Sequence, residues 1–121
     1  MLEIIEGFAD NVVAVAAKGQ VSRRDYSDVL VPAVENAFGR HRKVRCYYEL
    51  LREFSGMDSG AVWEDFKIGV EHLARWERVA VVTDVEWVRL AVNAFRFLVP
   101  CDVRIFGTTE AADARSWIAS D

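Results

Sequence analysis

One stretch decides the fold of this chain: Trp76-Glu77-Arg78-Val79-Ala80-Val81-Val82-Thr83-Asp84-Val85-Glu86-Trp87. Its run of Val and Ala is too continuous for a half-exposed strand and too short for a buried helix. It therefore predicts a central parallel strand that is covered on at least one face. Thr83 and Asp84 end the strand, and Asp84 is placed to cap a helix that begins at Val85. A strand, an acidic cap and a helix form half of a βαβ unit, which predicts an α/β protein.

The spacing of apolar residues predicts the other elements of the chain. Four more strands are expected, at 2–6, 12–18, 44–51 and 102–106. Three more helices are expected, at 23–38, at 61–75 and from residue 110 onward. Pro32 lies inside the first helical pattern and predicts a kink there. The segment 54–60 is the most irregular one, and we expect it to form a functional loop.

The order of these elements predicts the sheet. The first two strands form an antiparallel hairpin, and the later strands are joined by helices, which favours right-handed parallel crossovers. We expect a five-stranded mixed sheet, antiparallel only in the N-terminal hairpin, with four helices mainly on one face and a single domain over residues 1–121. Strands in chain order place 2–6 and 102–106 at the edges. Tyr48 and its alternating neighbours then face the helices, while Arg45, Tyr47 and Glu49 lie on a face that stays at least partly wet.

The helix at 61–75 has an apolar stripe. We expect that stripe to be buried, and it consists of Val62, Trp63, Phe66, Val70 and Leu73. Ile68 lies among polar residues on the opposite side of the helix and is expected to be exposed.

The helix at 85–98 carries more apolar surface than one packing face requires. Arg89, Asn93 and Arg96 form a narrow polar stripe with Glu86 beside it, and apolar residues occupy the rest of the circumference. Packing one face against a sheet needs an apolar stripe of roughly 100° or somewhat more. This helix is either wedged between the sheet and neighbouring helices, or it is a lid over an apolar pocket or a surface that inserts at a membrane interface.

Composition excludes several classes of function. Fifteen basic and nineteen acidic residues give a formal net charge of -4 at pH 7, whereas a nucleic-acid binder carries a basic surface. No apolar run approaches the roughly 20 residues that span a bilayer, and the N-terminus lacks the basic region of a signal peptide. We therefore expect a cytoplasmic protein that binds no nucleic acid.

The sequence contains no recognisable catalytic or metal-binding pattern. His41 and His72 lack partners at metal-ligand spacing, and Cys46 and Cys101 are too few for a disulfide framework. A nucleophile elbow, a phosphate loop and a dinucleotide fingerprint are all missing. We expect a protein that is not an enzyme and that uses no metal and no cofactor.

Five phrases of the sequence stand in a characteristic order. They are Asp25-Tyr26 with Val31-Pro32-Ala33, Val44-Arg45, Trp63-Glu64-Asp65-Phe66-Lys67, Arg78-Val79-Ala80-Val81-Val82, and Ala114-Arg115-Ser116-Trp117-Ile118. Together they resemble the SpoIIAA-like bacterial family, which is related to STAS and CRAL-TRIO domains. The resemblance covers essentially the whole chain and implies a (βα) superhelix with a five-stranded mixed sheet. It also implies membrane association and the binding of an apolar ligand under mobile helices.

The resemblance also points to an alternative. Anti-sigma-factor antagonists with the same fold carry a phosphorylatable serine after an Asp, at the start of the helix that follows the third strand. Asp58-Ser59-Gly60 is similar and lies at that place, although the helix that follows keeps the SpoIIAA-like pattern. The alternative function is therefore a STAS-type protein-interaction or regulatory module that is switched at Ser59. The other reading of these residues is that Ser59 or Asp58 only caps the helix.

Our prediction is a non-enzymatic domain that binds an apolar small molecule or lipid, or associates peripherally with the inner face of the membrane. The residues expected to contact the ligand or membrane are Trp63, Trp87, Val88, Leu90, Phe95 and Phe97. A protein partner and a homodimer are compatible with the same surface.

Overall fold

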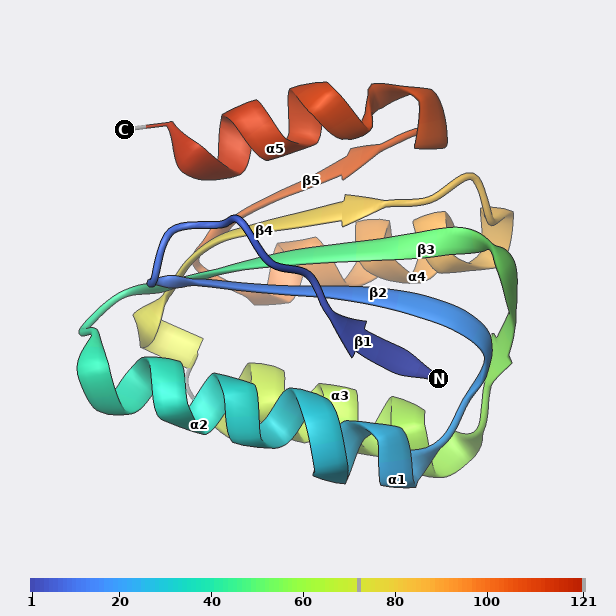
Figure 1. The fold of residues 1–121 in the computed structure, drawn as a ribbon, viewed down its shortest axis with the longest axis horizontal. Coiled ribbons are helices and arrows are strands. Elements are labelled where there is room, and N and C mark those ends of the chain that lie inside the picture. The colour runs from blue at the N-terminus through green and yellow to red at the C-terminus, as the bar shows by residue number, and fades with distance from the viewer. Residues whose placement is uncertain (72, 121) are drawn as a thin grey trace.

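The computed structural model describes residues 1–71 and 73–120, apart from the side chains of residues 63, 65, 66, 69, 70 and 73. Five strands form one sheet in the order β1-β2-β3-β4-β5 (Figure 1). They are β1 (Leu2–Ile4), β2 (Val12–Val21), β3 (Val44–Met57), β4 (Trp76–Val82) and β5 (Asp102–Phe106). β1 pairs with β2 antiparallel, and every other pair is parallel. The mixed sheet and its two predicted edges are thus confirmed.

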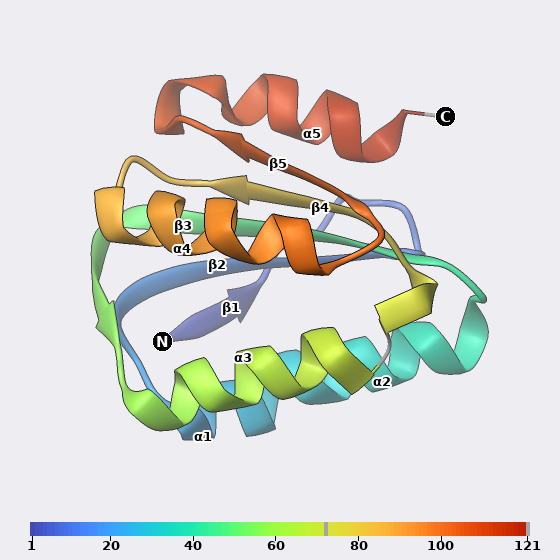
Figure 2. The same ribbon diagram turned by 180° about the vertical axis from the view of Figure 1, so that it is seen from behind.

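The helices cover the sheet unevenly. One face carries α2 (Val31–Arg40), α3 (Ser59–Glu71) and α4 (Glu86–Phe95), while α5 (Ala111–Ala119) packs on the other. Figure 1 shows α5 on the far side of the strands from α2 and α3, and Figure 2 shows α4 in front of the sheet when it is seen from behind. Three of the four predicted helices thus share one face, which confirms the prediction. α1 (Arg23–Asp25) is a single turn that precedes α2.

β4 is central because both of its faces are covered. Val81 points into the larger core under α2, α3 and α4, whereas Ala80 and Val82 point into the smaller core under α5. Successive side chains of a strand point to opposite faces, so a strand between two helical layers must be apolar throughout. This explains the continuous run of Val and Ala.

The face of the sheet that α5 covers is more buried than expected. Tyr47 is fully buried there, and Ala114 and Ile118 of α5 lie in the same cluster. Burial, together with the hydrogen bond that its hydroxyl donates to Glu49 at 2.7 Å, raises the pKa of Tyr47 to about 12. Alternation within β3 could not reveal this, because the covering side chains come from segments that are distant in the sequence, namely α5 and Phe8, whose ring centroid lies 4.8 Å from that of Tyr47.

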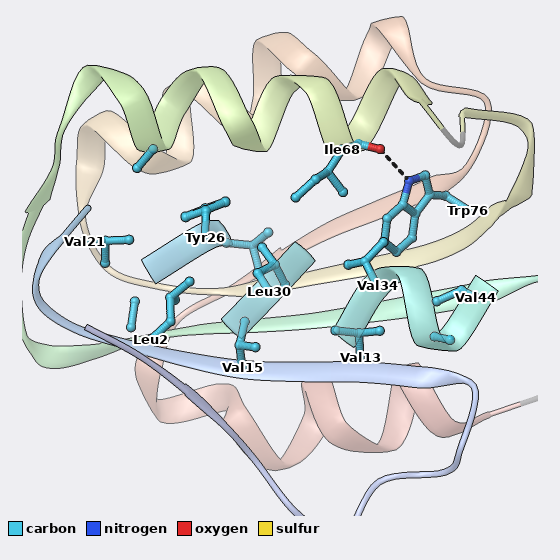
Figure 3. Close-up of a cluster of buried hydrophobic side chains, with 14 of the residues drawn as sticks. Leu2, Val13, Val15, Val21, Tyr26, Leu30, Val34, Val44, Ile68 and Trp76 are labelled. Atoms are coloured by element: carbon cyan, nitrogen blue, oxygen red, sulfur yellow. Dashed lines mark hydrogen bonds between the residues drawn. The ribbon is translucent and has the colours of Figure 1, made fainter. Parts of the chain in front are cut away.

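The larger core includes a residue that we expected to be exposed. Ile68 of α3 is 8% exposed, and its carbonyl accepts a hydrogen bond from the indole N–H of Trp76 at 3.5 Å (Figure 3). Val62, which we expected to be buried, is 51% exposed. The helix is turned so that Ala61 and Ile68, two turns apart, face the sheet. The rest of the predicted stripe, Trp63, Phe66, Val70 and Leu73, lies outside the described side chains.

The strands β2 and β3 are longer than predicted. β3 continues through residues 54–57, where we expected a loop, because it pairs there with the end of β2. Gly19 (φ +56°) and Gly56 (φ +152°) adopt backbone conformations that side chains disfavour, and the pairing register shifts at Gly19. These two glycines therefore allow an irregular strand pair.

Just before Pro32, where we predicted a kink, the chain forms a π turn, η1 (Tyr26–Leu30), in which the N–H of Val31 donates to the carbonyl of Tyr26. Proline lacks an N–H and its ring crowds the preceding turn. The wider turn relieves that crowding where α2 begins.

Asp84 does not cap α4 as predicted. The N–H of Val85 donates to the hydroxyl of Thr83 at 3.0 Å, and the Asp84 carboxylate accepts hydrogen bonds from the hydroxyl and the N–H of Thr108. These bonds hold the pKa of Asp84 below its ordinary value. The carboxylate therefore ties the end of β4 to the turn after β5.

The docking of α5 can be tested with two isoleucines. Ile118→Ala should lower the free energy of unfolding by about 2–5 kcal/mol, because it removes a fully buried side chain under α5. Ile4→Ala, at a position that is 48% exposed, should cost less than about 1 kcal/mol. Urea denaturation followed by circular dichroism measures both, and equal losses would contradict the packing of α5 on the sheet.

Candidate functional site

A cavity of about 180 Å³ lies between the sheet and the helices α2, α3 and α4. We call it the α4 cavity, because the inner side of α4 forms one of its walls. Its lining comes from residues of every helix on this face and from the strands β3, β4 and β5, namely Tyr26, Leu30, Val34, Cys46, Tyr48, Leu50, Met57, Ile68, Trp76, Val79, Val81, Val88, Val92, Phe95, Val99, Cys101 and Val103.

The chemistry of this lining is apolar and neutral. None of the described residues that line the cavity carries a charge at neutral pH. The polar side-chain atoms of its described residues are the hydroxyls of Tyr26 and Tyr48, which lie 3.0 Å apart in a hydrogen bond, the indole N–H of Trp76, and the thiols of Cys46 and Cys101. Burial raises the pKa of the Cys101 thiol, so this sulfur is neutral and weakly nucleophilic at pH 7.

The inner side of α4 forms part of the cavity wall. Val88 is buried, while Val92 and Phe95 are half-buried, and all three line the cavity. Val88 is the one buried residue of this helix. The helix is thus anchored to the sheet along a narrow line.

The outer face of α4, which we define to include the 3₁₀ turn η3 (Arg96–Leu98) that follows the helix, consists of Trp87, Leu90, Phe97 and Leu98 and is exposed. The exposed fractions are 49% for Trp87, 64% for Leu90, 85% for Phe97 and 70% for Leu98. Trp87 contacts one other aromatic ring of the described chain, Phe54 of β3, at a centroid distance of 6.2 Å. The interpretation that this helix is wedged between the sheet and its neighbours is therefore wrong.

A polar flank separates the two apolar sides of α4. Arg89 donates to the carbonyl of Thr83 at 2.7 Å, and Arg96 donates to the side chain of Asn93 at 3.4 Å. The predicted polar stripe is thus confirmed. It places two cations beside the outer face.

The predicted binding residues separate into two groups. Trp87, Leu90 and Phe97 lie on the outer face, whereas Val88 and Phe95 line the cavity, and Trp63 lies outside the described side chains. Tyr26, Tyr48, Trp76 and Cys101 also line the cavity, and no pattern in the sequence marks them as ligand contacts. The alternation of β3 did place Tyr48 on the helix-covered face, but no local signal could show that space remains above it.

Comparison with known proteins gives the family. A sequence profile described as SpoIIAA-like matches residues 12–119. The chain belongs to the SpoIIAA-like family. The search of curated proteins gave no match.

A solved structure agrees with this assignment at the level of the fold. It is the crystal structure of an uncharacterised protein with a SpoIIAA-like fold from Shewanella loihica PV-4. The two chains share 23% identity and superpose with a TM-score of 0.76, and the match covers 98% of this chain and 92% of the other. The predicted family and fold of this SpoIIAA-like domain are therefore confirmed.

Ser59 is the first residue of α3 and is exposed. The cap is Asp58, whose carboxylate accepts a hydrogen bond from the N–H of Ala61 at 2.8 Å. A phosphate on Ser59 would gain from the helix dipole, but it would lie beside a carboxylate that already occupies the helix terminus. The geometry therefore favours a structural function for this pair.

Within the described residues, no group of His, Cys, Asp or Glu is arranged to hold a metal ion. Among the same residues, no helix is long and apolar enough to cross a bilayer.

The cap of α3 can be tested by two substitutions at adjacent positions. Asp58→Ala should cost about 1 kcal/mol of stability, because the N–H of Ala61 loses its acceptor. Ser59→Ala should change stability by less than about 0.5 kcal/mol. Chemical denaturation measures both values, and the opposite ranking would show that Ser59 is the cap.

Proposed function

We propose that this SpoIIAA-like domain is a non-enzymatic binding protein that takes an apolar ligand in the α4 cavity and associates through the outer face of α4 with a membrane surface. One observation carries the proposal. α4 has apolar side chains on two sides, of which one lines a cavity and the other faces solvent. A helix that only covered a sheet would need apolar side chains on the side that faces the sheet, but not on the side that faces solvent.

The volume and the lining of the cavity support ligand binding. Engineered apolar cavities of about 150 Å³ stay dry and bind benzene. The α4 cavity is somewhat larger, at about 180 Å³, and is similarly apolar. A ligand there would regain the van der Waals contacts that the empty space forfeits. Because α4 is anchored mainly through Val88, moving it outward for ligand entry would disrupt little buried surface.

Toluene provides a direct test of the cavity. Toluene at about ten times its Kd should raise the Tm of the wild type by roughly 3–6 °C, because it binds the folded state alone. Val92→Phe, which places a larger side chain in the cavity wall, should abolish most of that shift. Val62→Phe, at an exposed position outside the cavity lining, is the matched control and should retain it. A wild type whose Tm ignores toluene would refute ligand binding in this cavity.

Exposed aromatic and aliphatic side chains support the membrane contact. Phe97 and Leu98 are among the most exposed large apolar residues of the described chain. Arg89 and Arg96 lie on the adjacent flank, where guanidinium groups can meet anionic headgroups while the apolar residues enter the interface. Each fully transferred large side chain would contribute on the order of 2 kcal/mol, so a few of them suffice for reversible binding.

Vesicle binding tests this second contact. Wild type should sediment with vesicles of phosphatidylcholine and phosphatidylglycerol, with a shift in tryptophan fluorescence from Trp87. Leu90→Ser with Phe97→Ser should weaken the association by about tenfold or more, while the far-UV spectrum stays unchanged because both positions are exposed. Ile4→Ser, at a half-exposed position on β1, should have no effect. Equal binding by the wild type and the double variant would refute the assignment of the outer face.

A switch at Ser59 is the less favoured alternative. Its exposure would permit modification, but the Asp58 cap beside it opposes an added phosphate.

A further inference from the structure

The strand β5 lies at an edge of the sheet and has unpaired backbone groups along one side. Among the described strands it pairs with β4 alone. The N–H of Thr83 donates to the carbonyl of Phe106 at 2.9 Å, and alternate residues of a parallel strand bond to the same neighbour, so residues 102, 104 and 106 bond to β4. The N–H and C=O groups of Val103 and Ile105 therefore point away from β4. Figure 2 shows no helix across this edge.

The charged side chains of β5 indicate which strand can pair with this edge. Asp102 and Arg104 are both exposed. The guanidinium of Arg104 lies 4.8 Å from the ring of Trp117 in α5, so Arg104 is on the face that α5 covers, and Asp102 shares that face because it is two residues away. The edge thus carries one acidic and one basic side chain on either side of Val103.

We propose that the free edge of β5 pairs antiparallel with the same edge of a second copy of this chain, with the two-fold axis at Val103. Asp102 of each copy then lies directly opposite Arg104 of the other copy. The two sheets become one continuous sheet.

Charge selects this register. Residues directly opposite each other in an antiparallel pair interact, and like charges there are destabilising. An axis at Asp102 would set the two aspartates against each other, and an axis at Arg104 would do the same with the two arginines. An axis at Ile105 would place Arg104 opposite Phe106 and leave both charges unmatched. With the axis at Val103, both charge pairs are attractive, and they are non-hydrogen-bonded pairs, in which side chains come closer.

The backbone fits the same register. Val103 directs its N–H and C=O outward, as a residue at the centre of a hydrogen-bonded pair must. Pro100 falls opposite Phe106 of the other copy, in a pair that exchanges no backbone hydrogen bonds. The missing N–H of proline therefore costs no bond there.

The opposite edge strand, β1, lacks these properties. It has three residues, and a two-fold axis at its middle would set Glu3 against Glu3 of the other copy. Glu3 also forms an ion pair with Lys18 of β2 at 3.1 Å. Short edge strands that carry charges are a common protection against strand pairing. We expect self-association at β5 and not at β1.

The dimer has a consequence for the outer face of α4. The two-fold axis of an antiparallel strand pair is perpendicular to the sheet, so both copies carry α4 on the same side of the joined sheet. For the proposed membrane contact, on which this consequence rests, the dimer presents two outer faces to one membrane. Two linked contacts bind more tightly than one, because the second binding event becomes intramolecular.

Sedimentation velocity over a range of protein concentrations tests the dimer. Wild type should shift from monomer toward dimer as its concentration rises. Asp102→Arg should weaken the association by about tenfold or more, because it sets two basic side chains against each other at both pairs. Asp28→Arg makes the same change of charge at an exposed position of η1 and should have no effect.

A charge swap makes the test specific for the register. Arg104→Asp should also weaken self-association, but it removes the contact with Trp117 as well. An equimolar mixture of the Asp102→Arg and Arg104→Asp proteins should form a heterodimer, since one edge is then basic and the other acidic. A double variant that carries both substitutions should regain the self-association of the wild type.

Amide hydrogen exchange followed by NMR locates the interface without any substitution. The N–H groups of Val103 and Ile105 should exchange more slowly as the concentration of the wild type rises. The N–H of Ile4, on the edge strand β1, is the control and should exchange at the same rate throughout.

The outcomes separate this inference from the proposed function. A wild type that stays monomeric up to about 1 mM would overturn the dimer. A dimer that Asp102→Arg leaves intact, or one whose formation leaves the exchange of Ile105 unchanged, would do the same. These experiments contain no membrane, so their failure leaves the vesicle contact of α4 standing, and a failed vesicle test leaves the dimer standing.

Discussion

The burial of β4 on both faces is the constraint on which the rest of the structure depends. Val81 needs a cover on one side, and Ala80 and Val82 need a cover on the other. A parallel sheet gains such covers from its crossover helices, which gather on one face when the strands lie in chain order. Within the described chain, the opposite face receives its cover from α5 and from residues between β1 and β2, such as Phe8. The C-terminal carbonyls of α5 accept hydrogen bonds from Arg45 on β3 and Arg78 on β4. Side chains of the two strands therefore hold α5 in place over the sheet.

The unequal covering also explains where the cavity lies. Three helices share the larger face, and α4 reaches the sheet along a narrow line through Val88. Space therefore remains between α4 and the strands.

α4 links that cavity to the surface. Its inner side chains touch the space in which a ligand would lie, and its outer side chains are exposed to solvent. A shift of the helix on ligand binding would move both sides together, so the two contacts of the proposed function share one structural element. By linkage, a ligand that favours one position of α4 would alter surface association, and surface association would alter ligand affinity by the same factor.

The sequence by itself determined the strands, their order and direction, the apolar excess of α4 and its polar stripe, because these follow from local periodicity and chain connectivity. Only the tertiary structure decided the rotation of α3, which buries Ile68 and exposes Val62, and the covering of Tyr47 by α5. It also decided the extension of β3 through Gly56 and the partner of Asp84. The reason is physical: periodicity shows which residues share one face of an element. Which elements pack against that face, and whether a cavity remains between the face and those elements, depends on the packing of segments that are distant in the sequence.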